Sequence, residues 1–115
     1  MFDELPHDSD GNALRSLAAN GSDLSREMEI EFMLDVPDRE SGLAVATMVE
    51  QLGFRTSVEM GDQSKRWTCY CSRTMVPTYQ SIIEIQKTFE KLGEPYDAKP
   101  DGWGSFGNSP VQGGH

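Results

Sequence analysis

A chain of 115 residues has room for one domain with a single hydrophobic core, and at this length neither disulfides nor a metal is required for stability. Its 19 acidic residues outnumber its 10 lysines and arginines, and the net charge of −9 disfavours direct binding to nucleic-acid phosphates. No apolar run approaches the roughly 20 residues of a membrane-spanning helix, and the first residues lack the features of a secretory signal. We therefore expect a cytoplasmic protein.

The charge is unevenly distributed along the chain. Residues 1–64 hold 14 of the 19 acids but only 4 of the 10 bases. Such a field attracts cationic partners, although a surface kept acidic for solubility has the same composition. Charge thus favours a basic partner and leaves its identity open.

The first half of the predicted domain contains a helix and a strongly patterned strand. After an acidic lead-in over 1–10 that we expect to be flexible, a short helix is predicted over 12–19, with Asp10 as its N-cap. A strand follows over 28–36, because apolar and mostly acidic residues alternate there with the period of a half-buried strand. Its solvent side is predicted to carry a row of carboxylates: Glu27, Glu29, Glu31 and Asp35.

The next elements are a helix and a hairpin. Asp38 is a suitable N-cap for an amphipathic helix that ends at Gly53. Apolar residues at i, i+3, i+4 and i+7 form one stripe on this helix: Val45, Met48, Val49 and Leu52. Alternating segments over 54–60 and 65–73 flank a turn, which predicts a β-hairpin.

The two cysteines lie in the second strand of this hairpin. Cys69 and Cys71 are two residues apart on one face of a strand, where a disulfide would be strained. The two histidines, His7 and His115, stand near opposite ends of the chain without the spacing of metal ligands. We therefore expect buried free thiols, no metal and no cofactor, and Trp67 on the same side as the cysteines is expected in the core.

The last third of the domain is predicted to be a helix followed by an edge strand or an ordered loop. Thr78 is placed to cap a helix that ends at Gly93, and residues 96–106 contain Trp103 and Phe106 among glycines and prolines. The tail over 107–115 is expected to be disordered. The predicted class is α+β: a ferredoxin-like βαββαβ sandwich with an extra short N-terminal helix, forming one domain over 11–106.

Catalytic motifs are not found in the sequence. It has no glycine-rich dinucleotide fingerprint, no P-loop, no H-E-x-x-H and no G-x-S-x-G. An RNA-binding sheet would need aromatic residues flanked by cations, whereas the first strand would present Glu29 and Glu31 to the phosphates. The sequence therefore favours a non-catalytic protein that binds a basic macromolecule, with RNA binding as a weaker alternative.

Near the end of the domain the sequence resembles a known family. Asp101, Gly102, Trp103 and Gly104 follow one another shortly after a long helix, and this tetrapeptide resembles the Y-D-G-W-G hallmark of the ribonuclease E inhibitor family, regulator of ribonuclease activity B or RraB. Pro100 stands where that hallmark has tyrosine. The segments at 8–14, 21–24 and 75–78 are similar to segments of the same family, so the resemblance spans about residues 8–106.

The resemblance implies a ferredoxin-like inhibitor that binds a ribonuclease E-like endoribonuclease, at the basic scaffold region of the RNA degradosome, and lowers RNA decay without cleaving RNA itself. A protein-interaction module of the same fold with a different basic partner is the alternative. For the tetrapeptide at 101–104, two interpretations remain open: a turn in which Trp103 plugs the edge of the sheet, or a direct partner contact. The predicted partner-binding residues are the carboxylate row and the tetrapeptide at 101–104.

Overall fold

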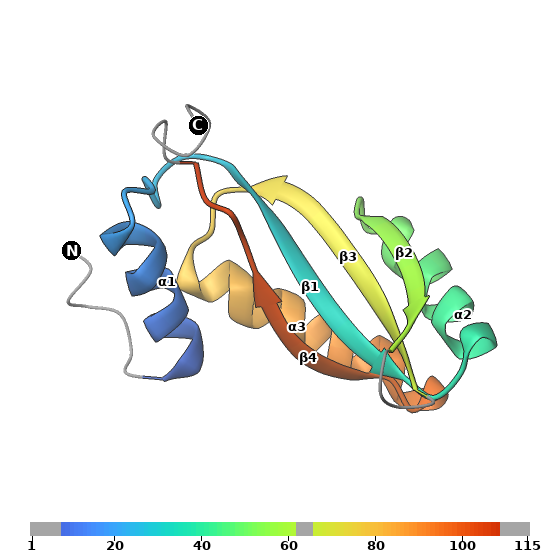
Figure 1. The fold of residues 1–115 in the computed structure, drawn as a ribbon. Coiled ribbons are helices and arrows are strands. Elements are labelled where there is room, and N and C mark those ends of the chain that lie inside the picture. The colour runs from blue at the N-terminus through green and yellow to red at the C-terminus, as the bar shows by residue number, and fades with distance from the viewer. Residues whose placement is uncertain (1–7, 62–65, 109–115) are drawn as a thin grey trace.

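The computed structural model describes residues 8–61 and 66–108, and within them four strands form one antiparallel sheet in the order β2-β3-β1-β4 (Figure 1). Three α-helices and a short 3-10 helix accompany the sheet in this part of the chain. In chain order the elements are α1 (Ser9–Ala19), β1 (Met28–Val36), α2 (Arg39–Glu50), β2 (Arg55–Met60), β3 (Trp67–Met75), α3 (Tyr79–Gly93), η2 (Glu94–Tyr96) and β4 (Lys99–Gly104).

The core lies between the sheet and two helices. In Figure 1, α2 and α3 lie behind the sheet, and α1 lies beside α3 at the β4 side. Alternation along β1 buries every second residue beneath these helices, from Met28 to Val36. Three rings, Phe32, Phe54 and Phe89, meet edge to face with centroids 5.1 to 6.1 Å apart. The opposite face of the sheet has no helix over it in this view, which leaves the other side chains of β1 open to solvent.

The predicted caps of the two long helices are confirmed. The Asp38 side chain accepts a hydrogen bond from the Ser41 amide at 2.8 Å, and the Thr78 hydroxyl accepts one from the Ser81 amide at 3.1 Å. Each bond satisfies an amide that the first turn of a helix leaves without a partner. The local sequence therefore marks the residue at which each of these helices begins.

The start of α1 differs from the prediction, which was wrong about the cap. The helix begins at Ser9, and its N-cap is Asp8, whose carboxylate accepts from the Gly11 amide at 2.8 Å. The Tyr79 hydroxyl of α3 donates to the other oxygen of Asp8 at 2.5 Å. Asp10, the predicted cap, instead binds side chains of α3 and β4. A tertiary contact thus selects between two acids that are equally suitable in the sequence.

The segment predicted as an edge strand or an ordered loop is a strand. β4 pairs antiparallel with β1, and the register shifts between Phe32 and Leu34. The α+β class and the N-terminal helix are confirmed. The complete order α-β-α-β-β-α-β, beginning on a helix, is not the classic ferredoxin pattern.

The expected boundaries of the domain are only partly covered by the described residues. Residues 8–10, expected in the lead-in, belong to α1 and its cap, and Gly107 and Asn108 follow β4 in contact with the domain. The predictions for 1–7 and 109–115 lie outside the described residues.

Candidate functional site

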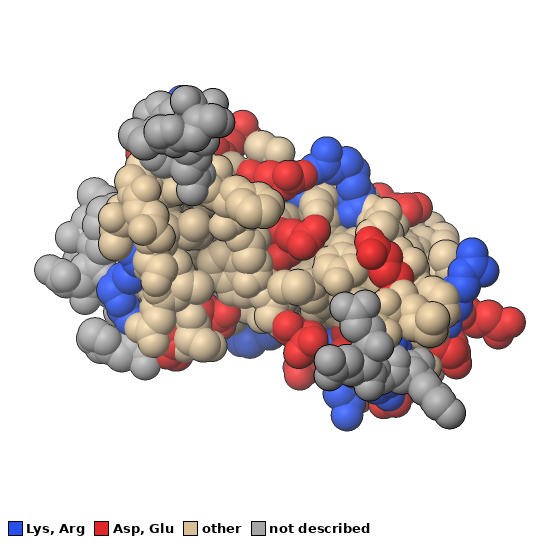
Figure 2. All heavy atoms as spheres, in the orientation of Figure 1, with Lys and Arg blue, Asp and Glu red and all other residues tan. Residues whose placement is uncertain are grey.

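The open face of the sheet brings together residues from three strands. On β1, Glu29 and Glu31 point away from the core, and the strand register places Glu31 beside Ser72 of β3 and Gly104 of β4. Figure 2 shows acidic side chains in the middle of this face, whereas lysines and arginines lie mainly toward its margins. The carboxylates predicted for one side of the first strand therefore lie on an exposed surface.

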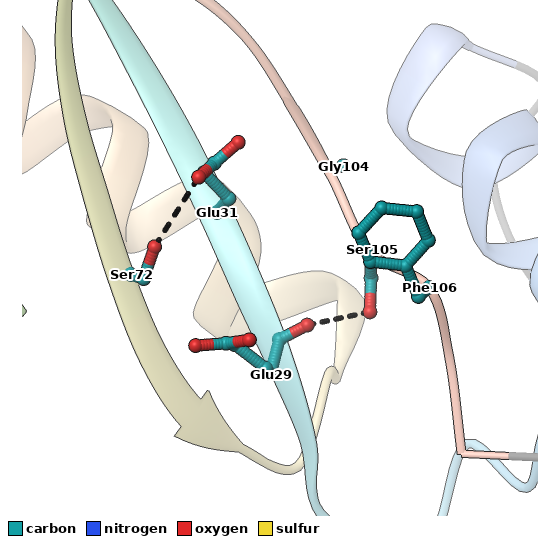
Figure 3. Close-up of a pocket in the computed structure, with 6 residues that line it drawn as sticks. All are labelled: Glu29, Glu31, Ser72, Gly104, Ser105 and Phe106. Atoms are coloured by element: carbon teal, nitrogen blue, oxygen red, sulfur yellow. Dashed lines mark hydrogen bonds between the residues drawn. The ribbon is translucent and has the colours of Figure 1, made fainter. Parts of the chain in front are cut away.

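Two adjoining hollows cross this face. The first has a volume of about 260 Å³ and lies between β1 and the end of β4 (Figure 3); its lining residues are Glu29, Glu31, Ser72, Gly104, Ser105 and Phe106. The second, of about 160 Å³, lies on the β2 side and is lined by Arg55 and Tyr70 among others. Glu29, Glu31 and Ser72 line both hollows. We call the two together the acidic trough.

The carboxylates of β1 are not equivalent. Arg55 forms a salt bridge with Glu29, and Arg66 Nε lies 2.6 Å from a carboxylate oxygen of Asp35. Within the described residues no lysine or arginine forms a salt bridge with Glu31, whose carboxylate accepts a long hydrogen bond, 3.5 Å, from the Ser72 hydroxyl. Two acids of the predicted row are therefore balanced by arginines, and Glu31 carries the negative charge at the centre of the trough.

Phe106 lines the first hollow, and the sequence did not predict it as a site residue. It is 90% exposed, the largest exposure among the big apolar residues of the described chain. The backbone around it is held: the Ser105 hydroxyl donates to the Glu29 carbonyl at 2.5 Å, and the Gly107 amide donates to the Ser105 hydroxyl at 3.0 Å. The signal in the sequence was weak, because a single aromatic residue among glycines and serines has no periodicity.

The predicted tetrapeptide is divided between two sides of the sheet. Trp103 lies opposite Phe32 and packs against the core, and its indole nitrogen donates to Asp10 of α1 at 2.8 Å. Gly104 lines the acidic trough, whereas Asp101 and Gly102 are exposed and Gly102 has a φ of 100°. The geometry of Trp103 matches a plug that joins α1 to the sheet.

Of the eight predicted partner-binding residues, the structure brings three together in the trough. These are Glu29, Glu31 and Gly104. Glu27 is exposed just before β1, and Asp35 lies at the other end of that strand beside Arg66. Hence three of the predicted residues form a compact group in the trough, and the other five lie outside it.

The two cysteines are free and buried, as predicted, and Trp67 is partly buried against the core. The sulfur atoms of Cys69 and Cys71 lie 3.8 Å apart. The neighbouring Cys69 thiol, together with burial, raises the pKa of the Cys71 thiol, so a reactive thiolate at Cys71 is disfavoured.

Among residues 8–61 and 66–108, no three His, Cys, Asp or Glu side chains gather as metal ligands. In the same ranges no helix has the length and apolar character needed to span a bilayer.

The fold and the site define a small α+β protein with one sheet face packed on helices and the other bearing an acidic trough. The chain belongs to the RraB family, regulator of ribonuclease activity B, whose family model matches residues 7–105. The match confirms the resemblance inferred from the tetrapeptide and the other segments. A comparison with curated proteins finds no match.

Proposed function

We propose that this protein is a non-catalytic regulator that binds a ribonuclease E-like endoribonuclease at a basic scaffold segment and so slows RNA decay. Membership of the RraB family supports a ribonuclease as the target. The single observation that supports binding to a basic segment is the acidic trough, on a sheet face that no described helix covers, in a chain of net charge −9. Opposite charges would speed the encounter and set the orientation of the partner.

The proposed contact surface is the open sheet face around Glu29 and Glu31. A cationic side chain approaching this face meets Glu31 at the centre of the trough, without displacing a described arginine from its carboxylate. Glu27, Asp35 and the exposed residues Asp101 and Gly102 would contact the flanking parts of a longer segment. RNA is a poorer ligand, because the carboxylates would repel its phosphates at the positions where an RNA-binding sheet stacks bases.

A matched pair of charge-reversal variants tests this assignment. Glu29→Lys with Glu31→Lys reverses the trough, and Glu84→Lys with Glu90→Lys makes the same change in net charge on exposed positions of α3. Association with the basic scaffold segment of a ribonuclease E-like enzyme should slow by roughly tenfold or more at low salt for the trough variant, and much less for the α3 variant. The difference should shrink as salt rises, because salt screens exposed charges.

The outcomes separate the candidate explanations. Equal slowing by both variants would mean that net charge acts without a specific face, and no slowing by the trough variant would refute binding at this surface. Failure of the wild type to bind the scaffold, with retention of another basic protein, would favour the alternative partner. The wild type should also slow RNA cleavage by the enzyme while cleaving no RNA alone.

A further inference from the structure

The exposure of Phe106 is not explained by the fold. An aromatic side chain that is 90% exposed contributes little to the core, yet the residues on both sides of it are tied to the domain. Asn108 supplies the second tie, since its side-chain nitrogen donates to the carbonyls of Asp23 and Glu27 at 3.0 and 3.2 Å. The backbone that carries the ring is therefore fixed beside the acidic trough.

The chemistry around the ring is complementary to a cation with a flat apolar face. Glu31 offers a carboxylate without a described salt-bridge partner, and Gly104, which has no side chain, leaves the floor between this carboxylate and Phe106 open (Figure 3). The face of an aromatic ring attracts cations, and an exposed phenylalanine gains by covering that face. Charge and shape thus point to the same kind of occupant.

We propose that the first hollow seats one arginine side chain of the partner, with its guanidinium paired to Glu31 and lying against the ring of Phe106. Arginine fits better than lysine because its planar group can bond a carboxylate through two donors and stack on an aromatic ring at the same time. This proposal rests on the proposed function and adds to it that the protein recognises an arginine of the basic segment.

Two peptides that differ in one kind of residue test the seat. We would measure binding of a ten-residue arginine-rich peptide and of the same peptide with every arginine replaced by lysine, at equal net charge. The wild type should bind the arginine peptide about two- to fivefold more tightly, because only the planar guanidinium can stack on the ring while bonding Glu31 through two donors. Phe106→Ala should remove this preference, because it weakens binding of the arginine peptide more than binding of the lysine peptide, whereas Glu31→Gln should weaken both.

Phe106→Leu is the matched control, because it keeps an apolar side chain but removes the ring. It should lose the arginine preference as Phe106→Ala does, and both variants should melt like the wild type because the ring is exposed. Equal affinity of the wild type for the two peptides, binding of neither, or a preference retained by Phe106→Ala would overturn the seat. If the seat is overturned but charge reversal in the trough still slows association with the scaffold segment, the proposed function survives. If the arginine preference is found but the protein does not bind the scaffold segment, the seat survives and the ribonuclease partner does not.

Discussion

Replacing Trp103 tests whether the hallmark tryptophan acts in folding or in binding. The indole lies between the core and α1: its ring centroid is 6.5 Å from that of Phe32, and its nitrogen donates to Asp10 at 2.8 Å. Truncation of a core aromatic residue to alanine costs about 3–5 kcal/mol. Because Trp103 is only partly buried, we expect Trp103→Ala to lower the free energy of unfolding by about 3 kcal/mol, at the lower end of this range.

A second substitution separates the two contributions. Trp103→Phe keeps most of the ring packing but removes the donor to Asp10, which would retain its bond from Gln86. A hydrogen bond to a charged group contributes about 1.5–3 kcal/mol, and partial exposure places the expected loss near 1.5 kcal/mol. Hydrogen exchange of the α1 amides should accelerate in both variants, because the indole ties α1 to β4.

Urea unfolding followed by circular dichroism measures these free energies, with Phe106→Ala as the control that should stay within about 0.5 kcal/mol of the wild type. The reasoning would be refuted if Trp103→Ala also stayed within that limit. If the same variant then failed to bind the scaffold segment, Trp103 would be a partner contact, the other interpretation of the tetrapeptide.

Three further predictions concern pH, packing and metals. The Tyr79 hydroxyl and the Gly11 amide lower the pKa of Asp8 below its usual 3.8, so its stabilisation is present above about pH 4 and is lost as the pH falls through the lowered value. The difference in unfolding free energy between wild type and Asp8→Asn should shrink accordingly in acid; a constant difference would contradict the cap. Gly42→Ala should cost about 1–2 kcal/mol in thermal melts, because its Cβ would lie 2.7 Å from a Val58 methyl carbon, and an unchanged melting temperature would argue against this close packing. Purified protein should show no hydrolase activity and no response to EDTA; chelator-sensitive turnover that copurifies with it would be incompatible with a non-catalytic role.

Local patterns in the sequence were sufficient for most of the fold. The alternation over β1 predicted which side of the strand is buried, and Asp38 and Thr78 marked the starts of two helices. These features depend on residues two to four positions apart, whose relative directions are fixed by the backbone geometry of a strand or a helix. The carboxylates of the trough were predicted for the same reason.

The tertiary structure decided what stands beside each carboxylate. Arg55 and Arg66 balance Glu29 and Asp35, and Glu31 lines one hollow with Gly104 and Phe106, which follow it by more than 70 residues. Strand order and register bring these groups together, and both depend on how the whole sheet packs against its helices. The choice of Asp8 over Asp10 as the cap of α1 has the same origin, since Tyr79 donates to Asp8 and Trp103 donates to Asp10 from distant parts of the chain. The sequence by itself thus determined which side of β1 faces solvent, and only the packing of distant segments determined which of its carboxylates form a site.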